Sequence, residues 1–174
     1  SAASDVYKRQ IDDGLFDPKA ANHDLYGGVG LFAAAMADRF GSTTRMTVVE
    51  SDEVATEYAA ENLSEWVGAR ALSSRVDRYL AQVVKNITAL EHSRWKQATV
   101  IVDPPRQGAG KETISHLAEL SPAQIVYVAC DPVALARDVA YLAEAGYELG
   151  DIRAFDLFPN THHMEAVAHF VRAS

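Results

Sequence analysis

The chain has 174 residues, of which 48% are hydrophobic and 23% charged, and this ordinary globular composition excludes a disordered polypeptide. One cysteine excludes a disulfide scaffold, an all-cysteine zinc site and an iron–sulfur cluster on four cysteines within the segment. The 16 basic and 24 acidic residues give a net charge of −8, which argues against this segment alone holding nucleic acid through phosphate contacts.

The amino-terminal stretch SAASDVYKRQ shows no core periodicity and begins with serine rather than methionine. We interpret residues 1–14 as a non-native or truncated leader and place one domain at residues 15–174. No apolar run approaches the roughly 18 residues of a membrane span, so we expect a soluble, cytoplasmic protein without membrane contact. The usage of Met, Trp and Phe gives no sign of a large exposed apolar face, and we expect a monomer.

Short apolar runs alternate with helical patterns from about residue 21, which is typical of a parallel α/β sheet. The first strand is expected to be short or frayed, because Asn22 and His23 stand where apolar residues are expected. Buried strands are predicted at residues 45–50, 98–103 and 124–130. Apolar residues recur at helical spacing in two series, Val76, Leu80, Val83, Val84, Ile87 and Leu90, then Leu135, Val139 and Leu142.

The last part of the chain departs from this alternation. Residues 147–158 and 166–171 are two expected strands with no helix-length segment between them, which predicts an antiparallel hairpin at one edge of the sheet. Pro132 and Gly146 mark the start and the stop of the helix that precedes this hairpin.

Acidic or nucleophilic side chains fall where the predicted strands end, namely Asp24, Glu50, Asp103, Cys130 and Asp131. Ligands of open α/β sheets lie in the crevice outside the carboxyl ends of the strands. We therefore place the functional site at this edge of the sheet.

A glycine-rich turn follows the first strand and opens a helix near Leu31. Gly28 and Gly30 let the backbone turn tightly and approach a ligand, and Ala33 completes a loose dinucleotide fingerprint. Glu50, about twenty residues further on, is well placed to hold ribose hydroxyls. The pattern favours a nucleotide-like cofactor over a turn that merely packs a helix on a strand.

Two further strand ends carry candidate chemistry. Two prolines hold Asp103 and Arg106 in a rigid turn. The alternative interpretation of this turn is purely structural: it ends the strand and carries a salt bridge in solvent. Cys130 precedes a helix whose dipole favours a thiolate. The alternative interpretation is that Cys130 is a small, buried, unreactive side chain. His162, His163 and Glu165 are too few for a metal site, so we predict no metal.

Four motifs occur in order along the chain, DLYGGVGLF at residues 24–32, DPPR at 103–106, YVACDP at 127–132 followed by LARD at 135–138, and FPNTHHME at 158–165. Together they resemble the catalytic domain of the RNA 5-methyluridine methyltransferases, which use S-adenosylmethionine to modify uridines of transfer or ribosomal RNA. The resemblance covers about residues 15–172. It implies a Rossmann-like methyltransferase fold, with a seven-stranded, mostly parallel sheet whose last strand is antiparallel.

The resemblance also implies roles for individual residues. Cys130 matches the nucleophile that adds to carbon 6 of uracil, and Glu165 matches the base that removes the proton from carbon 5. Asp103 matches the acid beside cofactor and uracil, and Arg106 supports it at the substrate. The positions that match cofactor-binding residues are Asp24, Tyr26, Gly28, Gly30, Glu50, Asp77 and Asp103.

Some family features are missing from this sequence. Members often carry a cysteine where this chain has Gly27, and full-length members have an amino-terminal RNA-binding barrel and a cofactor-contacting glutamine that are not visible here. RNA binding is therefore expected to need such parts. Three alternatives stay open: a nitrogen methyltransferase that acts through Asp103 without covalent catalysis, a nicotinamide-dependent oxidoreductase, and an inactive fragment.

Overall fold

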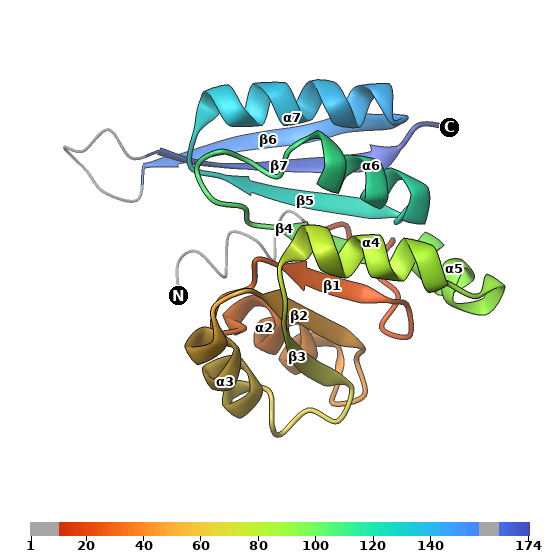
Figure 1. Ribbon diagram of the computed structural model, residues 1–174, viewed down its shortest axis with the longest axis vertical. Helices are drawn as coiled ribbons and strands as arrows, with labels where there is room; N and C mark the ends of the chain where they lie inside the picture. The colour runs from red at the N-terminus through yellow and green to blue at the C-terminus, as the bar shows by residue number, and fades with distance from the viewer. Residues whose placement is uncertain (1–10, 157–163) are drawn as a thin grey trace.

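The computed structural model describes residues 11–156 and 164–174. Within these ranges the strands form one sheet in the order β3-β2-β1-β4-β5-β7-β6 (Figure 1). The strands are Asn22–Leu25 (β1), Met46–Glu50 (β2), Ala69–Ser73 (β3), Thr99–Val102 (β4), Gln124–Ala129 (β5), Tyr147–Asp156 (β6) and Met164–Arg172 (β7). The helices are Leu31–Phe40 (α2), Glu53–Asn62 (α3), Val76–Asn86 (α4), Ala89–Lys96 (α5), Lys111–Leu120 (α6) and Pro132–Glu144 (α7).

Strands β1 to β5 pair in parallel, whereas β7 runs antiparallel to both of its neighbours, β5 and β6. The expected mostly parallel, seven-stranded sheet with an antiparallel last strand is thus confirmed. The parallel pairs need crossover connections, and the helices between the strands supply them. The expected hairpin is also present as β6 and β7, which form the edge of the sheet.

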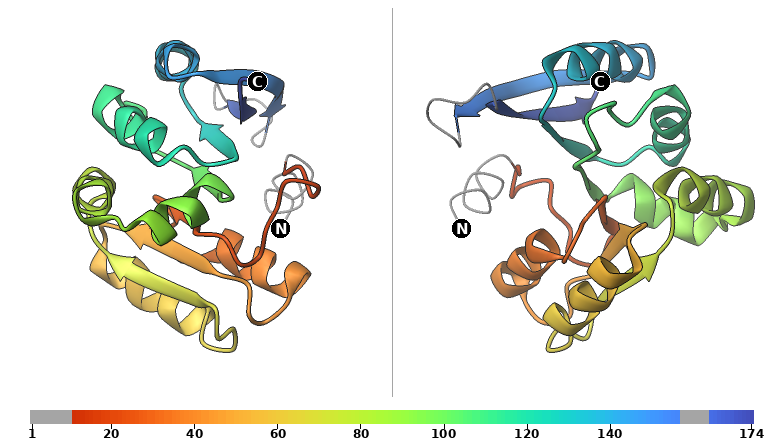
Figure 2. Two further views of the ribbon diagram at one scale, coloured as in Figure 1. Left: turned by 90° about the vertical axis from the view of Figure 1, so that its right-hand side faces the viewer. Right: turned by 60° about the vertical axis from the view of Figure 1, so that its left-hand side comes forward.

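Helices cover both faces of the sheet, as the views in Figure 2 show. Successive strand residues point to opposite faces, so Val49 packs in the core under α4 to α7 while Val48 packs against α2 and α3. Ile11 and Phe16 are buried in this second core. None of the helices in the described ranges combines the length and the apolar character that a bilayer crossing requires.

The apolar series that begins at Val76 extends over two helices, α4 and α5. Helix α4 ends at Asn86, and Thr88 starts α5 with a capping box, in which its hydroxyl accepts the Glu91 N–H and the Glu91 side chain accepts the Thr88 N–H. This local alternative ends the helix, so Leu90, the last member of the series, is 62% exposed rather than packed. Helical spacing alone did not show the break.

Strand β1 is short, as expected, but it is a central strand and it is not frayed. Asn22 is buried because its Oδ1 accepts the Thr99 N–H (2.9 Å) and its amide donates to the Asp17 carbonyl (2.8 Å). His23 is buried because its ring stacks on Trp95 with centroids 4.2 Å apart and both ring nitrogens are hydrogen-bonded. A polar residue is tolerated in a central strand when its groups are satisfied in this way.

Candidate active site

The carboxyl ends of β1, β2 and β4 open onto a cavity of about 800 Å³. Tyr26, Glu50 and Asp103 stand at these three strand ends and line the cavity. The first turn of α4 contributes Asp77, which is held by Arg75 through a 2.7 Å ion pair. The loop 107–110 and the first turn of α6 form another wall. Most of the residues that match cofactor positions therefore reach one cavity.

The glycine-rich turn has the backbone geometry that its glycines predict. Gly28 and Gly30 have positive φ angles of 56° and 77°, and Gly30 caps the start of α2. The Gly28 N–H donates to Glu50 Oε1 (3.1 Å), and the other oxygen of Glu50 accepts the Asp52 N–H (2.7 Å). Tyr26 also has a positive φ angle, of 59°, which is uncommon outside glycine and marks a constrained turn. These contacts hold the Glu50 carboxylate beside the turn.

Gly27 has a steric reason to be glycine in this chain. A Cβ at this position would lie 2.7 Å from Val48 Cγ1 and 2.9 Å from Asp24 Cγ, closer than real contacts allow. A cysteine at this position, which the family resemblance led us to expect, would require this backbone to move. The turn is thus packed directly against the Asp24 carboxyl group.

Asp24 is an unusual carboxyl group because it is 2% exposed and, among the described residues, no hydrogen-bond partner is found for its Oδ2. Burial, together with the nearby charges of Asp103 and Glu50, raises the pKa of Asp24 to about 7. The side chain is therefore partly neutral near physiological pH.

The raised pKa of Asp24 predicts a pH-dependent gain in stability for Asp24→Asn. The folded state favours the protonated acid, so this contribution is full below the unfolded pKa near 4 and is lost as the pH rises through about 7. We expect the amide to raise the free energy of unfolding by about 1–3 kcal/mol near pH 8 and much less near pH 5. Urea unfolding at both pH values measures the difference. Asp38→Asn on the exposed face of α2 is the control, and an equal effect at both pH values would contradict the prediction.

Asp103 follows β4 and continues its ladder, since its N–H donates to the Leu25 carbonyl (3.2 Å). Asp103 is exposed as a residue, but the protein around its carboxyl group removes part of the hydration of that group. This raises the pKa of Asp103 to about 6, and the nearby charge of Glu165 adds to the rise. A fraction of Asp103 is consequently protonated at neutral pH. A protonated carboxyl group can donate a hydrogen bond to a carbonyl oxygen on which negative charge develops.

Cys130 and Glu165 are brought together by the antiparallel pairing of β5 with β7. Ala129 is paired with Ala166, so continuing this register by one residue sets Cys130 opposite Glu165. Glu165 is also the residue whose charge acts on Asp103. The Cys130 side chain is exposed, so the interpretation of this cysteine as a small buried hydrophobe is wrong.

The start of α7 favours a Cys130 thiolate less than the sequence led us to expect. Asp131 caps the helix, because its Oδ1 accepts the N–H groups of Val133 (2.9 Å) and Ala134 (3.0 Å). These N–H groups and the negative cap leave less of the helix dipole to favour a Cys130 thiolate. Arg106 is exposed in the turn after β4, and its positive charge adds to the capping bonds that lower the pKa of Asp131.

A buried network, to which the sequence assigned no role, shapes the loop on the far wall of the cavity. The buried carboxylate of Asp138 accepts hydrogen bonds from the Tyr127 hydroxyl (2.5 Å) and the Ala109 N–H (2.8 Å). A Cβ at Gly108 would lie 2.6 Å from Asp138 Oδ2, which explains the glycine. The YVACDP and LARD motifs contain Tyr127 and Asp138, so the motifs carried the signal although spacing alone did not.

The histidines considered as metal ligands, His162 and His163, lie outside the described residues. In residues 11–156 and 164–174 no group of three or more His, Cys, Asp or Glu side chains is arranged to hold a metal ion.

The fold defines a broad class of proteins. The chain matches the structure of a precorrin-6y C5,15-methyltransferase from Geobacter metallireducens with a TM-score of 0.70, over 99% of this chain and 88% of that one, at 13% sequence identity. A likeness at such low identity shows the fold alone. The chain therefore has the Rossmann-like fold of S-adenosylmethionine-dependent methyltransferases.

Residues 13–173 match the tRNA (uracil-5-)-methyltransferase family, and the chain belongs to this family. An RNA methyltransferase of Streptomyces avermitilis, itself uncharacterized, is 42% identical over 95% of this chain and 36% of its own length. The tRNA (uracil-54, C5)-methyltransferase of Pyrococcus abyssi, solved in complex with S-adenosyl-L-homocysteine, has a TM-score of 0.73 at 28% identity over 98% of this chain and 37% of its own. The resemblance drawn from the four motifs is confirmed. The chain spans about a third of the length of these relatives.

Proposed function

We propose that the chain is the catalytic domain of an enzyme that transfers a methyl group from S-adenosylmethionine to carbon 5 of a uridine in transfer or ribosomal RNA. One observation carries the proposal, which is that the strand register sets Cys130 opposite Glu165 with Asp103 nearby. The family and the ligand of the archaeal relative support the same reaction and cofactor. RNA is the proposed partner, and monomeric state and cytoplasmic location stay predictions from composition.

The residues around the cavity fit this cofactor. Glu50, held at the end of β2, can accept hydrogen bonds from ribose hydroxyls, and Gly28 and Gly30 allow a close approach of the backbone. The carboxyl groups of Glu50 and Asp77 line the cavity, and their negative charge suits a positively charged sulfonium. When bound, S-adenosylmethionine supplies an electrophilic methyl group.

The side chains can then carry out covalent catalysis on the uracil ring. The Cys130 thiolate forms a bond to carbon 6, and the electron pair of the ring double bond moves toward the carbonyl oxygen, where Asp103 or Arg106 can stabilise it. Carbon 5 becomes nucleophilic and takes the methyl group, whose bond to the sulfonium sulfur breaks and leaves a neutral thioether. Glu165 accepts the proton from carbon 5, the bond from carbon 6 to sulfur breaks, and the thiolate is restored. The target base must leave its stack to reach the site.

The cofactor proposal is tested by calorimetric titration of the chain with S-adenosylmethionine, with NAD as the comparison ligand. We expect S-adenosylmethionine to bind and NAD not to bind. Glu50→Gln should weaken binding about tenfold, because a charged acceptor for the ribose is lost. Glu53→Gln, an exposed neighbour, is the control. Preferential binding of NAD would favour the oxidoreductase alternative, and no binding would identify an inactive fragment.

The reaction is tested by incubating the protein and S-adenosylmethionine with RNA that contains 5-fluorouridine. Fluorine at carbon 5 cannot leave as a proton, so covalent chemistry through Cys130 stops at a protein–RNA adduct that mass spectrometry detects. Methylation of ordinary RNA without such an adduct would instead support a nitrogen methyltransferase that acts without covalent catalysis.

A further inference from the structure

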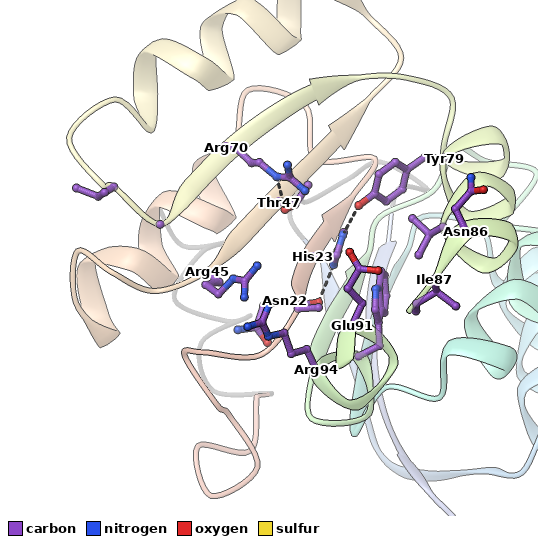
Figure 3. Close-up of a pocket in the computed structure, with 15 residues that line it drawn as sticks. Asn22, His23, Arg45, Thr47, Arg70, Tyr79, Asn86, Ile87, Glu91 and Arg94 are labelled. Carbon is purple, nitrogen blue, oxygen red and sulfur yellow. Dashed lines mark hydrogen bonds between the residues drawn. The ribbon is translucent and has the colours of Figure 1, made fainter. Parts of the chain in front are cut away.

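A second cavity, of about 640 Å³, lies at the amino ends of β1, β2 and β3 (Figure 3). The amino-terminal residues of β1, Asn22 and His23, line it together with Thr47 on β2. Tyr79 and Ile87, on and just after α4, form another wall. The proposed methyl transfer takes place at the carboxyl ends of the strands and makes no use of this cavity, so a ligand here would be independent of that reaction.

Arginines from three separate elements line this second cavity. Arg45 directly precedes β2, Arg70 lies on β3, and Arg94 lies in the last turn of α5. They gather in a chain whose net charge is −8. In residues 11–156 and 164–174 no ion pair joins any of the three to a carboxylate. The positive charge of the cluster is therefore not neutralised by ion pairing.

One carboxylate, that of Glu91, also lines the cavity, but it is already hydrogen-bonded at the start of α5. It accepts hydrogen bonds from the N–H (2.9 Å) and the hydroxyl (3.0 Å) of Thr88 in the capping box of α5. These bonds, and to a smaller extent the charge of Arg94, lower the pKa of Glu91. A single carboxylate against three guanidinium groups leaves the cavity with a net positive charge.

Arg70 is held in place by neutral oxygen atoms. Its Nε donates to the Thr47 hydroxyl (3.1 Å), and its guanidinium group also bonds to the Tyr79 side chain. His23 orients that tyrosine: the Ala21 carbonyl can only accept, so His23 Nδ1 carries the proton and Nε2 accepts from the Tyr79 hydroxyl (2.7 Å). Tyr79 then presents its lone pairs to Arg70. The guanidinium group is positioned before any ligand arrives, and its charge stays available.

Burial, reinforced by the charges of Arg70 and Arg45, lowers the pKa of His23 to about 4. His23 is therefore neutral at physiological pH and adds no charge to the cavity. Its ring also stacks on the ring of Trp95, which lines the same cavity. The positive potential comes from the arginines.

We propose that the cavity at the amino ends of β1, β2 and β3 binds a phosphate group of a nucleotide or of an RNA strand through Arg45, Arg70 and Arg94. Planar guanidinium groups donate paired hydrogen bonds to phosphate oxygens, and three of them around one cavity match that chemistry. Tyr79 and Ile87 offer an aromatic and an aliphatic surface for a ribose or a base. The volume lies in the range of ordinary small-molecule sites.

The test is calorimetric titration of the chain with uridine 5′-monophosphate, inorganic phosphate and phosphate-free uridine. We expect the two phosphate compounds to bind and uridine not to bind. Arg45→Gln/Arg70→Gln should weaken binding at least about tenfold. Arg78→Gln/Arg153→Gln removes the same charge from exposed positions on α4 and β6 and should change the affinity less than about twofold.

A single-stranded oligouridine without terminal phosphate distinguishes the two sources of the phosphate group. Tighter binding of the oligouridine than of the mononucleotide indicates an RNA backbone, and binding of the mononucleotide alone indicates a nucleotide.

Nuclear magnetic resonance of the unaltered chain provides a second readout that does not depend on the fold of a variant. Added phosphate should shift the amide signals of Arg45, Thr47 and Gly68 around this cavity and leave those of Gly108 and Gly110 in place. The proposal is overturned if no phosphate compound binds, if uridine binds as well as its monophosphate, if both double variants lose the same affinity, or if the shifts are confined to the other cavity.

Discussion

Cys130→Ala is expected to abolish methyl transfer to RNA, with a loss of at least about a thousandfold in turnover. Carbon 5 of uracil is a poor nucleophile until a group adds to carbon 6, and Cys130 is the exposed thiol at the end of β5 opposite Glu165. The measurement is transfer of a labelled methyl group from S-adenosylmethionine to RNA, in a form of the protein with measurable turnover.

Two controls make the loss at Cys130 specific. The side chain is exposed, so the substitution should change the free energy of unfolding by no more than about 0.5 kcal/mol. It also lies outside the lining of the 800 Å³ cavity, so the affinity for S-adenosylmethionine should be unchanged. Turnover that survives in Cys130→Ala would disprove covalent catalysis by this residue.

Glu165→Gln should trap the reaction after methylation. Without a base, the proton stays on carbon 5, the bond between sulfur and carbon 6 cannot break, and a covalent complex with ordinary RNA accumulates. Turnover should fall by about 10²–10⁴-fold. Denaturing gels or mass spectrometry would detect the complex, and Glu165→Gln/Cys130→Ala should not form it.

A second effect is expected from the same substitution. The charge of Glu165 contributes to the raised pKa of Asp103, so the neutral amide should lower that pKa toward its ordinary value. Glu148→Gln, an exposed carboxylate change on β6, is the matched control and should affect neither turnover nor this pKa. Full turnover in Glu165→Gln, without an accumulated complex, would assign the base to another residue.

Local sequence patterns predicted some features of the site and of the helices correctly and missed others. Gly28 and Gly30 were predictable because each turn dictates its own backbone angles, and the structure confirms their positive φ values. The helical spacing from Val76 to Leu90 did not show the break between α4 and α5, because the capping box at Thr88 competes with the apolar spacing over a few residues. The first strand is short, as expected, but it is not frayed, because partners from distant segments satisfy Asn22 and His23.

The sequence by itself determined the alternation of strands and helices, the residues at the strand ends and the four ordered motifs, because periodicity, turn chemistry and motif order are properties of neighbouring residues. The tertiary structure decided which side chains lie next to those residues and how deeply they are buried. The pairing of Ala129 with Ala166 brings Cys130 to Glu165 across 35 positions of the chain. Burial among other carboxyl groups raises the pKa of Asp24, and the amino ends of three strands gather Arg45 and Arg70 around a second cavity. Such effects arise from distances between remote segments, which the order of residues does not display.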